Sequence, residues 1–145
     1  MAQNTDVPLR FLLMIYPTTD ARGGTVSHEE CSEGPFLTTA GMQWFLDHYL
    51  SGGDGDPEDP RVSPLLSDDA ILARSPATLV ITAEHDPLRD EGEAFAERLQ
   101  GVGVPASVSR YDGMFHAFVA FAEFLDDGRR ALAEAGAAVR SAVSD

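Results

Sequence analysis

Three segments of the chain carry the hydrophobic pattern of β-strands. Residues 11–16 are continuously apolar and stop at Pro17, as in a strand that is buried on both faces. Residues 77–82 are rich in β-branched side chains and run into a polar turn at residues 84–87. Residues 106–111 alternate between apolar and polar side chains, which suits a strand at the edge of a sheet.

Helical patterns lie between and after these strands. In residues 42–50, apolar side chains recur at i, i+3, i+4, i+7 and i+8, which predicts an amphipathic helix. A second helix is predicted over residues 90–102, because Asp90 and Glu93 have the spacing of a capping box. After Gly128, apolar positions at 132, 135, 139 and 143 predict a C-terminal helix. The alternation of strands and helices with short connections predicts parallel strands in a layered α/β sheet.

The connection between the first two strands is unusually long. Almost sixty residues lie between Pro17 and Ser75, and they hold one clear helix and a loop-like run rich in Gly, Asp and Pro at residues 51–60. A connection of this length is usually functional in a compact domain, for example as a lid or cap over a site.

The composition narrows the possible roles of the chain. At 145 residues it is long enough for one domain with a sizeable core. Its net charge of −14 argues against binding to nucleic acid or to an anionic membrane surface. No apolar run approaches the roughly 18–20 residues that span a bilayer. The single cysteine, Cys31, excludes an internal disulfide, and the polar start of the chain shows no export signal, so we expect a cytoplasmic protein.

An acid and a histidine follow two of the predicted strands. Asp86 comes after the second strand and His116 after the third. Open α/β sheets place their ligands at the carboxyl ends of the strands, so the two side chains can meet as the orienting half of a catalytic triad. On spacing alone the alternative stays open, because Asp-Pro turns are common and a histidine in a loop can have an unrelated partner.

Longer strings in the sequence resemble a known family. Residues 11–17 (FLLMIYP), 59–64 (DPRVSP), 81–92 (ITAEHDPLRDEG) and 111–118 (YDGMFHAF) occur in the order and at the spacing of the hormone-sensitive-lipase family of α/β-hydrolase esterases. The resemblance runs from about Leu9 to the C-terminus. It implies the C-terminal half of an α/β-hydrolase fold, with three parallel strands, flanking helices and part of a cap. Residues 1–145 would form one partial domain, with a cap-like insertion within 18–63.

The resemblance also implies an activity and its residues. Asp86 would be the triad acid and His116 the triad base of a carboxylic-ester hydrolase that needs no metal or cofactor. One small departure is Ala117, where the family usually has glycine after the histidine. A methyl group at this position removes no catalytic atom.

A larger departure is the missing nucleophile. The family's Gly-x-Ser-x-Gly elbow and its His-Gly-Gly oxyanion motif both precede the Leu-Leu-Met-Ile-Tyr-Pro strand. No serine of this chain has glycine two positions away on both sides; Ser32 and Ser51 have one on a single side. Residues 1–3 resemble the tail of the helix that follows the nucleophile. We therefore expect the chain to be inactive alone; the alternative is a non-catalytic binding or assembly module built on the half-fold, or a chance match.

The resemblance suggests further contacts with substrate. Residues 27–50 would contribute to a cap over the acyl pocket, where Trp44 and Phe45 could face the acyl ester. Leu88, directly after the acid turn, could line the same pocket. The alternative for these three side chains is that they only pack the cap helix and the core.

Other polar residues are expected to be structural. Asp90 and Glu91 are interpreted as a helix cap and a dipole partner. The adjacent residues His28 to Cys31 lack the spacing of a metal site and are interpreted as a solvated loop. The expected partner is a missing N-terminal half, or a second copy through exposed strand edges, since residues 11–16 would lack a neighbouring strand. The family also tends to dimerise through its last strand, here residues 106–111.

Overall fold

A single parallel sheet organises the molecule. The computed structural model describes residues 9–51 and 55–144, so the expectation for residues 1–3 lies outside the described residues. Strands β1 (Phe11–Ile15), β2 (Ala77–His85) and β3 (Ala106–Phe115) pair in the order β1-β2-β3. In the register, Phe11 pairs with Ala77 and Thr78 pairs with Ala106. The predicted fold class is confirmed.

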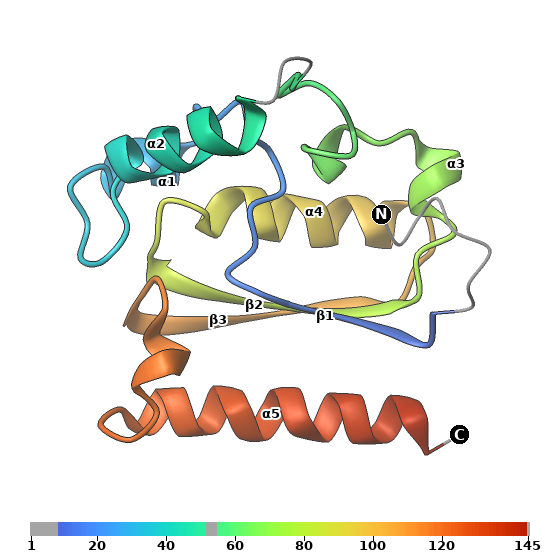
Figure 1. The fold of residues 1–145 in the computed structure, drawn as a ribbon. Helices are drawn as coiled ribbons and strands as arrows, with labels where there is room; N and C mark the ends of the chain where they lie inside the picture. Colours follow the sequence, from blue (N-terminus) through green and yellow to red (C-terminus); the bar gives the residue numbers. More distant parts are fainter. Residues whose placement is uncertain (1–8, 52–54, 145) are drawn as a thin grey trace.

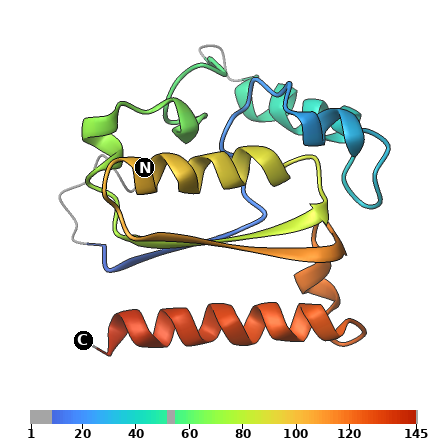
Figure 2. The same cartoon turned by 180° about the vertical axis from the view of Figure 1, so that it is seen from behind.

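The sheet lies between two layers of helices. Helix α4 (Arg89–Gly101) covers one face of the sheet and helix α5 (Asp126–Val143) covers the other (Figures 1 and 2). The core on the α5 side includes Ile81 and Phe118, and the core on the α4 side includes Phe95 and Leu99. Strand β2 is buried along most of its length because it has a strand on each side and a helix on each face.

The cap-like segment lies beyond α4, on the side of the molecule away from α5 (Figure 1). It contains α1 (Val26–Glu30) and α2 (Thr39–Leu50), followed by the 3₁₀ helix η2 (Pro64–Leu66) and the short helix α3 (Asp69–Leu72). The predicted helix of residues 42–50 is confirmed as part of α2. Its apolar stripe is not fully buried, however, because Phe45 and Tyr49 are exposed and only Met42 is buried.

The predicted capping box at the start of α4 is wrong. The residue at the N-cap position is Leu88, and no side chain caps the helix. The carboxylate of Asp90 instead accepts a hydrogen bond from the backbone N–H of Ser27 at 2.7 Å. Glu93 accepts one from the hydroxyl of Thr82 at 2.9 Å and also binds Arg110. Both carboxylates are thus used in tertiary contacts that the local sequence cannot show.

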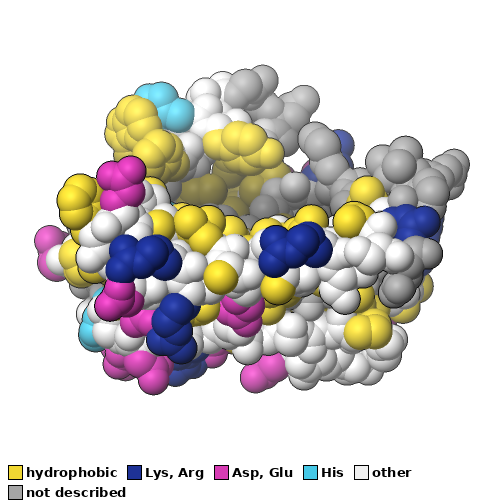
Figure 3. All heavy atoms as spheres, turned by 90° about the horizontal axis from the view of Figure 1, so that it is seen from below, with side chains coloured by type: hydrophobic (Ala, Val, Ile, Leu, Met, Phe, Trp, Pro, Cys, Tyr) yellow, Lys and Arg dark blue, Asp and Glu magenta, His cyan; other side chains and the backbone are white. Residues whose placement is uncertain are grey.

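Helix α5 also differs from its prediction. It begins at Asp126, before Gly128, and its buried residues are Gly128, Ala131 and Ala135. Of the predicted apolar positions, Leu132, Val139 and Val143 are exposed. Small side chains face the sheet, so the helix packs closely against it, and the larger ones remain at the surface. Seen from the α5 side, hydrophobic side chains show along the helix and around a hollow behind it (Figure 3).

Strands β2 and β3 are longer than their hydrophobic patterns predicted. They continue past residues 82 and 111 because they pair with each other, with Ala83 opposite Tyr111 and His85 opposite Phe115, around an irregularity in the register. This extension carries both strands to the residues of the candidate site. No helix in residues 9–51 and 55–144 is long and apolar enough to cross a membrane.

Candidate active site

Asp86 lies in the turn between β2 and α4 and is completely buried. Its Oδ1 atom accepts a hydrogen bond from the backbone N–H of Leu88 at 2.9 Å. Its backbone carbonyl accepts one from the N–H of Arg89 at 3.0 Å. These bonds fix the carboxylate at the carboxyl end of the sheet, with Oδ2 left for a further partner.

That partner is His116, which follows the end of β3. The His116 Nδ1 atom lies 2.8 Å from Asp86 Oδ2, within hydrogen-bond reach, so the two side chains meet as the sequence predicted. An ionised carboxylate only accepts hydrogen bonds, so Nδ1 carries a proton and Nε2 is the ring nitrogen left for other chemistry. The imidazole is partly exposed, with 20% of its side-chain surface accessible, whereas the carboxylate is shielded. This arrangement can move a proton at Nε2 while the buried carboxylate holds the ring.

Tyr16 completes the surroundings of the histidine. Its ring centroid lies 4.6 Å from that of His116, with 58° between the ring planes. The backbone of Tyr16 has φ = 38°, which is rare for a residue with a Cβ, and its N–H donates to the carbonyl of Ile81 at 2.7 Å. Burial and then the negative charge of Asp86 raise the pKa of the Tyr16 hydroxyl. Sequence reasoning missed this residue, although its place at the end of a buried strand, before Pro17, was an available signal.

An apolar cavity of about 610 Å³ opens beside His116. Its walls come from the end of β1, the segment after it, α2 and the turn after Asp86. The lining residues are Tyr16, Thr18, Leu37, Met42, Phe45, Leu46, Tyr49, Val62, Leu88 and His116. The cavity therefore combines a proton-transfer group with a mainly apolar wall, as sites for small ligands usually do.

The three side chains predicted to contact substrate have different positions. Phe45 and Leu88 line the cavity. Trp44 does not line it; 56% of its surface is exposed, and its ring packs on those of Phe45 at 5.1 Å and His48 at 4.0 Å. Adjacent residues of an α-helix point about 100° apart; Phe45 and Leu46 both reach the cavity, whereas Trp44, one position earlier in α2, does not.

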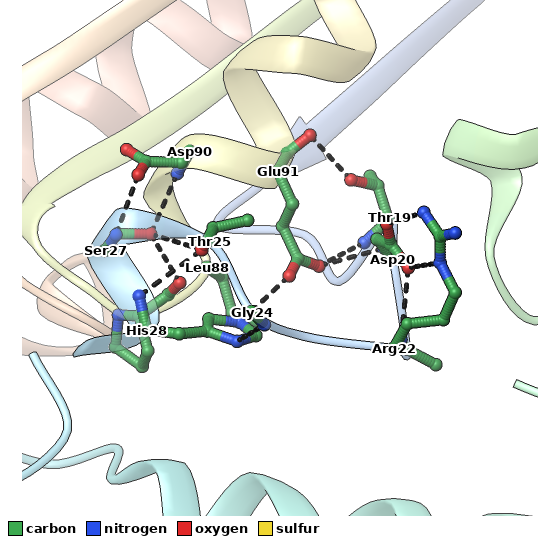
Figure 4. Close-up of polar contacts among 12 residues, drawn as sticks. Thr19, Asp20, Arg22, Gly24, Thr25, Ser27, His28, Leu88, Asp90 and Glu91 are labelled. Carbon is green, nitrogen blue, oxygen red and sulfur yellow. Dashed lines mark hydrogen bonds and ion pairs between the residues drawn. The ribbon is translucent and has the colours of Figure 1, made fainter.

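The expectation of a solvated loop at residues 28–31 is wrong. Residues 28–30 belong to helix α1, and His28 and Cys31 are buried. The expectation that Glu91 serves as a dipole partner is incomplete, because this carboxylate is fully buried and binds His28 (Figure 4). Within the part of the chain that the structure describes, no group of three His, Cys, Asp or Glu side chains could hold a metal ion.

Comparison with known proteins gives the family of the chain. A family model described as alpha/beta hydrolase fold matches residues 1–120. The chain belongs to the α/β-hydrolase family.

Curated relatives of this α/β hydrolase include esterases. It is 35% identical over 136 residues to a carboxylesterase, NlhH, of Mycobacterium tuberculosis, a match that covers 94% of the chain and 43% of that relative. It is 41% identical over 104 residues to an esterase of Gibberella moniliformis, with 70% of the chain and 32% of the relative covered. The chain therefore spans less than half the length of the curated relatives it matches.

A solved structure agrees with this assignment. An esterase from Pyrobaculum calidifontis has a TM-score of 0.82 and 41% identity to this α/β hydrolase, and the match covers 90% of the chain and 42% of that protein. Together these similarities confirm the predicted resemblance to α/β-hydrolase esterases of the hormone-sensitive-lipase type.

Proposed function

We propose that this chain supplies the acid–base half of the active site of a carboxylic-ester hydrolase. The observation that carries the proposal is the 2.8 Å contact between His116 Nδ1 and the buried carboxylate of Asp86, beside an apolar cavity that His116 itself lines. The geometry is that of the orienting pair of a serine hydrolase. The esterase names of the relatives support the same reaction class.

In the proposed reaction, His116 transfers a proton in each of two steps, formation and hydrolysis of the acyl-enzyme. Its Nε2 accepts the proton of a serine hydroxyl as that oxygen attacks the ester carbonyl, and it then gives the proton to the departing alcohol. Asp86 keeps Nδ1 protonated and stabilises the imidazolium that forms in between. A water molecule then attacks the acyl-enzyme: Nε2 accepts a proton from the water and gives it to the serine oxygen as the carboxylic acid leaves. The apolar wall, including Phe45 and Leu88, receives the acyl chain.

The nucleophile is proposed to come from outside this chain. No serine lines the cavity within residues 9–51 and 55–144, and no serine in the sequence has the glycine pattern of an elbow. We therefore propose that the chain alone does not form an acyl-enzyme. We also propose that residues 18–63 act as part of a cap, since α2 contributes several residues to the cavity wall.

The free edge of the sheet suggests where a partner binds. Among the described strands, β1 pairs only with β2, so its other edge is available for a further strand. A complementary polypeptide that carries the nucleophile is the proposed partner at this edge. A second copy of the chain is the alternative, and it would correspond to a non-catalytic assembly role.

The experiment combines the chain with the N-terminal part of a similar esterase, which carries a nucleophile elbow, and measures hydrolysis of p-nitrophenyl butyrate. The mixture is expected to hydrolyse the ester, and His116→Ala is expected to reduce the rate by about 10³-fold or more. The chain alone should show no burst of product. Hydrolysis by the mixture that survives His116→Ala would contradict the role of His116, and a His116-dependent burst from the chain alone would contradict the need for a partner.

A further inference from the structure

A buried carboxylate outside the acid–base pair connects the cap segment to α4. Glu91 lies in the first turn of α4 and has no exposed surface. Its Oε1 accepts hydrogen bonds from the backbone N–H groups of Thr19 at 2.6 Å and Asp20 at 3.1 Å. Its backbone carbonyl accepts one from the Thr19 hydroxyl at 2.7 Å. Among the described residues no arginine or lysine pairs with Glu91, so backbone donors and the helix N-terminus stabilise this anion.

The remaining oxygen of Glu91 binds a histidine with a defined tautomer. His28 Nε2 lies 3.1 Å from Glu91 Oε2, and His28 Nδ1 lies 3.0 Å from the backbone nitrogen of Gly24 (Figure 4). The N–H of Gly24 can only donate, so Nδ1 is the acceptor and the proton is on Nε2. A Cβ on Gly23 would lie 2.8 Å from Nδ1, so the loop leaves no room for a side chain there. Both ring nitrogens are therefore used to hold the cap segment.

Helix α1 is also bound to the turn that carries the triad acid. The Ser27 hydroxyl donates to the carbonyl of Pro87 at 2.7 Å. The Ser27 N–H donates to the carboxylate of Asp90 at 2.7 Å (Figure 4). Pro87 directly follows Asp86 in the sequence. The cap segment thus contacts the region after Asp86 at two places: Pro87, just before α4, and Asp90, in the first turn of α4.

These contacts determine the relative position of two walls of the cavity. Two of the lining residues, Thr18 and Leu88, come from segments far apart in the sequence. Thr18 precedes Thr19, which Glu91 binds, and Leu88 lies in the turn that carries Asp86. We propose that Glu91 is a positioning residue for the acyl cavity: with His28 it fixes the Thr18 wall against the Leu88 wall beside His116. The inference rests on the proposed function in one respect, namely that the cavity receives the acyl group.

The chemistry of the contact requires a carboxylate. Two backbone donors and one histidine donor converge on the two oxygens of Glu91. A glutamine has one oxygen and one NH₂ group, so its NH₂ would face either an N–H of the backbone or the Nε2–H of His28. Glu91→Gln therefore leaves at least one buried donor without an acceptor, while the volume of the side chain is unchanged.

The test compares Glu91→Gln with Glu97→Gln in the full 145-residue chain. Glu97 is exposed on the same helix, so its variant makes the same change of charge without touching the buried network. In Glu91→Gln, we expect amide hydrogen exchange at Thr19 and Asp20 to accelerate about 10- to 100-fold. We also expect the methyl resonances of Thr18 and Leu88 to shift. Glu97→Gln should change neither.

The resonances of the cavity residues Thr18 and Leu88 show whether Glu91 positions the cavity or only stabilises its own surroundings. If exchange accelerates at Thr19 while the Thr18 and Leu88 resonances stay unchanged, the proposal is overturned. A titration with ethyl butyrate, followed at the same methyl groups, is expected to show binding about tenfold weaker in Glu91→Gln. Absence of ethyl butyrate binding to the wild-type chain would count against the proposed function, and the methyl shifts without ester would still decide the positioning role.

A second pair of variants covers the case in which Glu91→Gln does not fold. His28→Gln keeps an NH₂ donor for Glu91 near the place of Nε2, whereas His28→Leu has a similar size and no donor. The expected result is that Thr18 and Leu88 keep their resonances in His28→Gln and shift in His28→Leu. Equal spectra for the two variants would overturn the proposal, because the donor to Glu91 would then have no effect on the cavity.

Discussion

Two residues next to the candidate catalytic histidine have unusual backbone conformations. Tyr16, whose ring contacts that of His116, has φ = 38°. Ala117, which follows His116 in the sequence, has φ = 69°. Residues with a Cβ rarely adopt such angles, and they persist where the surrounding structure holds them. The left-handed residue at 117 turns the chain from β3 into the 3₁₀ helix η3 (Phe118–Phe121), so that His116 leaves the sheet toward Asp86.

Ala117→Gly is expected to stabilise the fold by about 0.5–1 kcal/mol. Glycine removes a left-handed penalty of about 1–2 kcal/mol, which is partly offset by about 0.4–1 kcal/mol of extra chain entropy in the unfolded state. Urea denaturation measures the difference. Ala120→Gly, at an exposed position of η3 without a positive φ, is the control and should destabilise. A lower stability for Ala117→Gly than for the wild type would contradict the strain argument.

A second residue-scale effect concerns Tyr111 in the α5-side core. Its hydroxyl donates to Glu134 at 2.7 Å, and burial together with this hydrogen bond raises the pKa of Tyr111 to about 12. The folded state thus holds the proton more tightly than the unfolded state, whose tyrosines titrate near 10. The contribution to stability is complete below about pH 10 and is lost as the pH rises through about 12.

Tyr111→Phe is therefore expected to flatten the loss of stability between about pH 10 and 12. The measurement is the free energy of unfolding in urea at several alkaline pH values for both proteins. The two proteins differ only in this hydroxyl, so the difference between the two curves is the informative quantity. Parallel curves over the whole range would show that Tyr111 does not retain its proton in the folded state.

At the scale of elements, Gly128 decides how close α5 lies to η3. A Cβ at this position would lie 2.9 Å from the Cα of Ala122 and 3.0 Å from the carbonyl oxygen of Phe118. Both are backbone atoms, which cannot move aside alone. At Gly136, further along α5, the nearest atom belongs to the flexible guanidinium of Arg140 at 3.2 Å.

The two glycines are expected to respond to alanine with opposite signs. Gly128→Ala should destabilise the fold by about 1–3 kcal/mol through overpacking. Gly136→Ala should stabilise it by up to about 1 kcal/mol through helix propensity. Thermal unfolding of the two variants beside the wild type checks both. If Gly128→Ala were as stable as Gly136→Ala, the close approach of α5 and η3 would not be a constraint.

The elements that the sequence predicted are those whose patterns depend on local burial. Residues 77–82 are mostly buried between two strands and two helical layers, and predicting this needs no knowledge of which elements they meet. Residues 11–16 do contain a strand, but the prediction that it is buried on both faces is wrong, because it lies at the edge of the described sheet and is only half-buried. The capping box at the start of α4 was wrong because Asp90 bonds to Ser27, 63 residues away. The core face of α5 was also misjudged, since small residues at 128, 131 and 135 carry little hydrophobic signal.

The same distinction applies to the candidate site. The geometry of Asp86 and His116 could be predicted because both follow adjacent parallel strands and because the surrounding strings match a family. The places of Thr18 and Leu37 in the cavity wall could not be predicted, because they depend on how the segment after β1 folds back over α4. Glu91 and His28 have no local pattern that distinguishes a buried pair from two solvated side chains.

At the scale of the whole molecule, the outer edge of β1 and the net charge have opposite effects on self-association. Among the described strands, β1 pairs only with β2, and the backbone groups on its other edge favour pairing with another chain. The net charge of −14 makes two copies of the chain repel each other. Salt weakens this repulsion, since the screening length falls from about 30 Å at 0.01 M to about 10 Å at 0.1 M.

Self-association of the chain is therefore expected to increase with both protein concentration and salt. Sedimentation at several concentrations in 10 mM and in 500 mM NaCl measures the apparent mass. An equal mixture with the complementary esterase segment should suppress self-association if that segment occupies the edge of β1. A monomer at every concentration and salt level would contradict association through this edge.

The distances along the sequence that the polar contacts span also set the order in which they can form. Asp86 and His116 are 30 residues apart within one strand–helix–strand unit, whereas Thr19 and Glu91 are 72 apart. During synthesis, the segment that enters the cap leaves the ribosome first and finds its partners only once α4 has been made. Closing the longer loop also costs more chain entropy. When the whole chain refolds, the shorter loop of the acid–base pair therefore closes at the smaller entropy cost, whereas during synthesis Thr19 and Glu91 have both been made before His116.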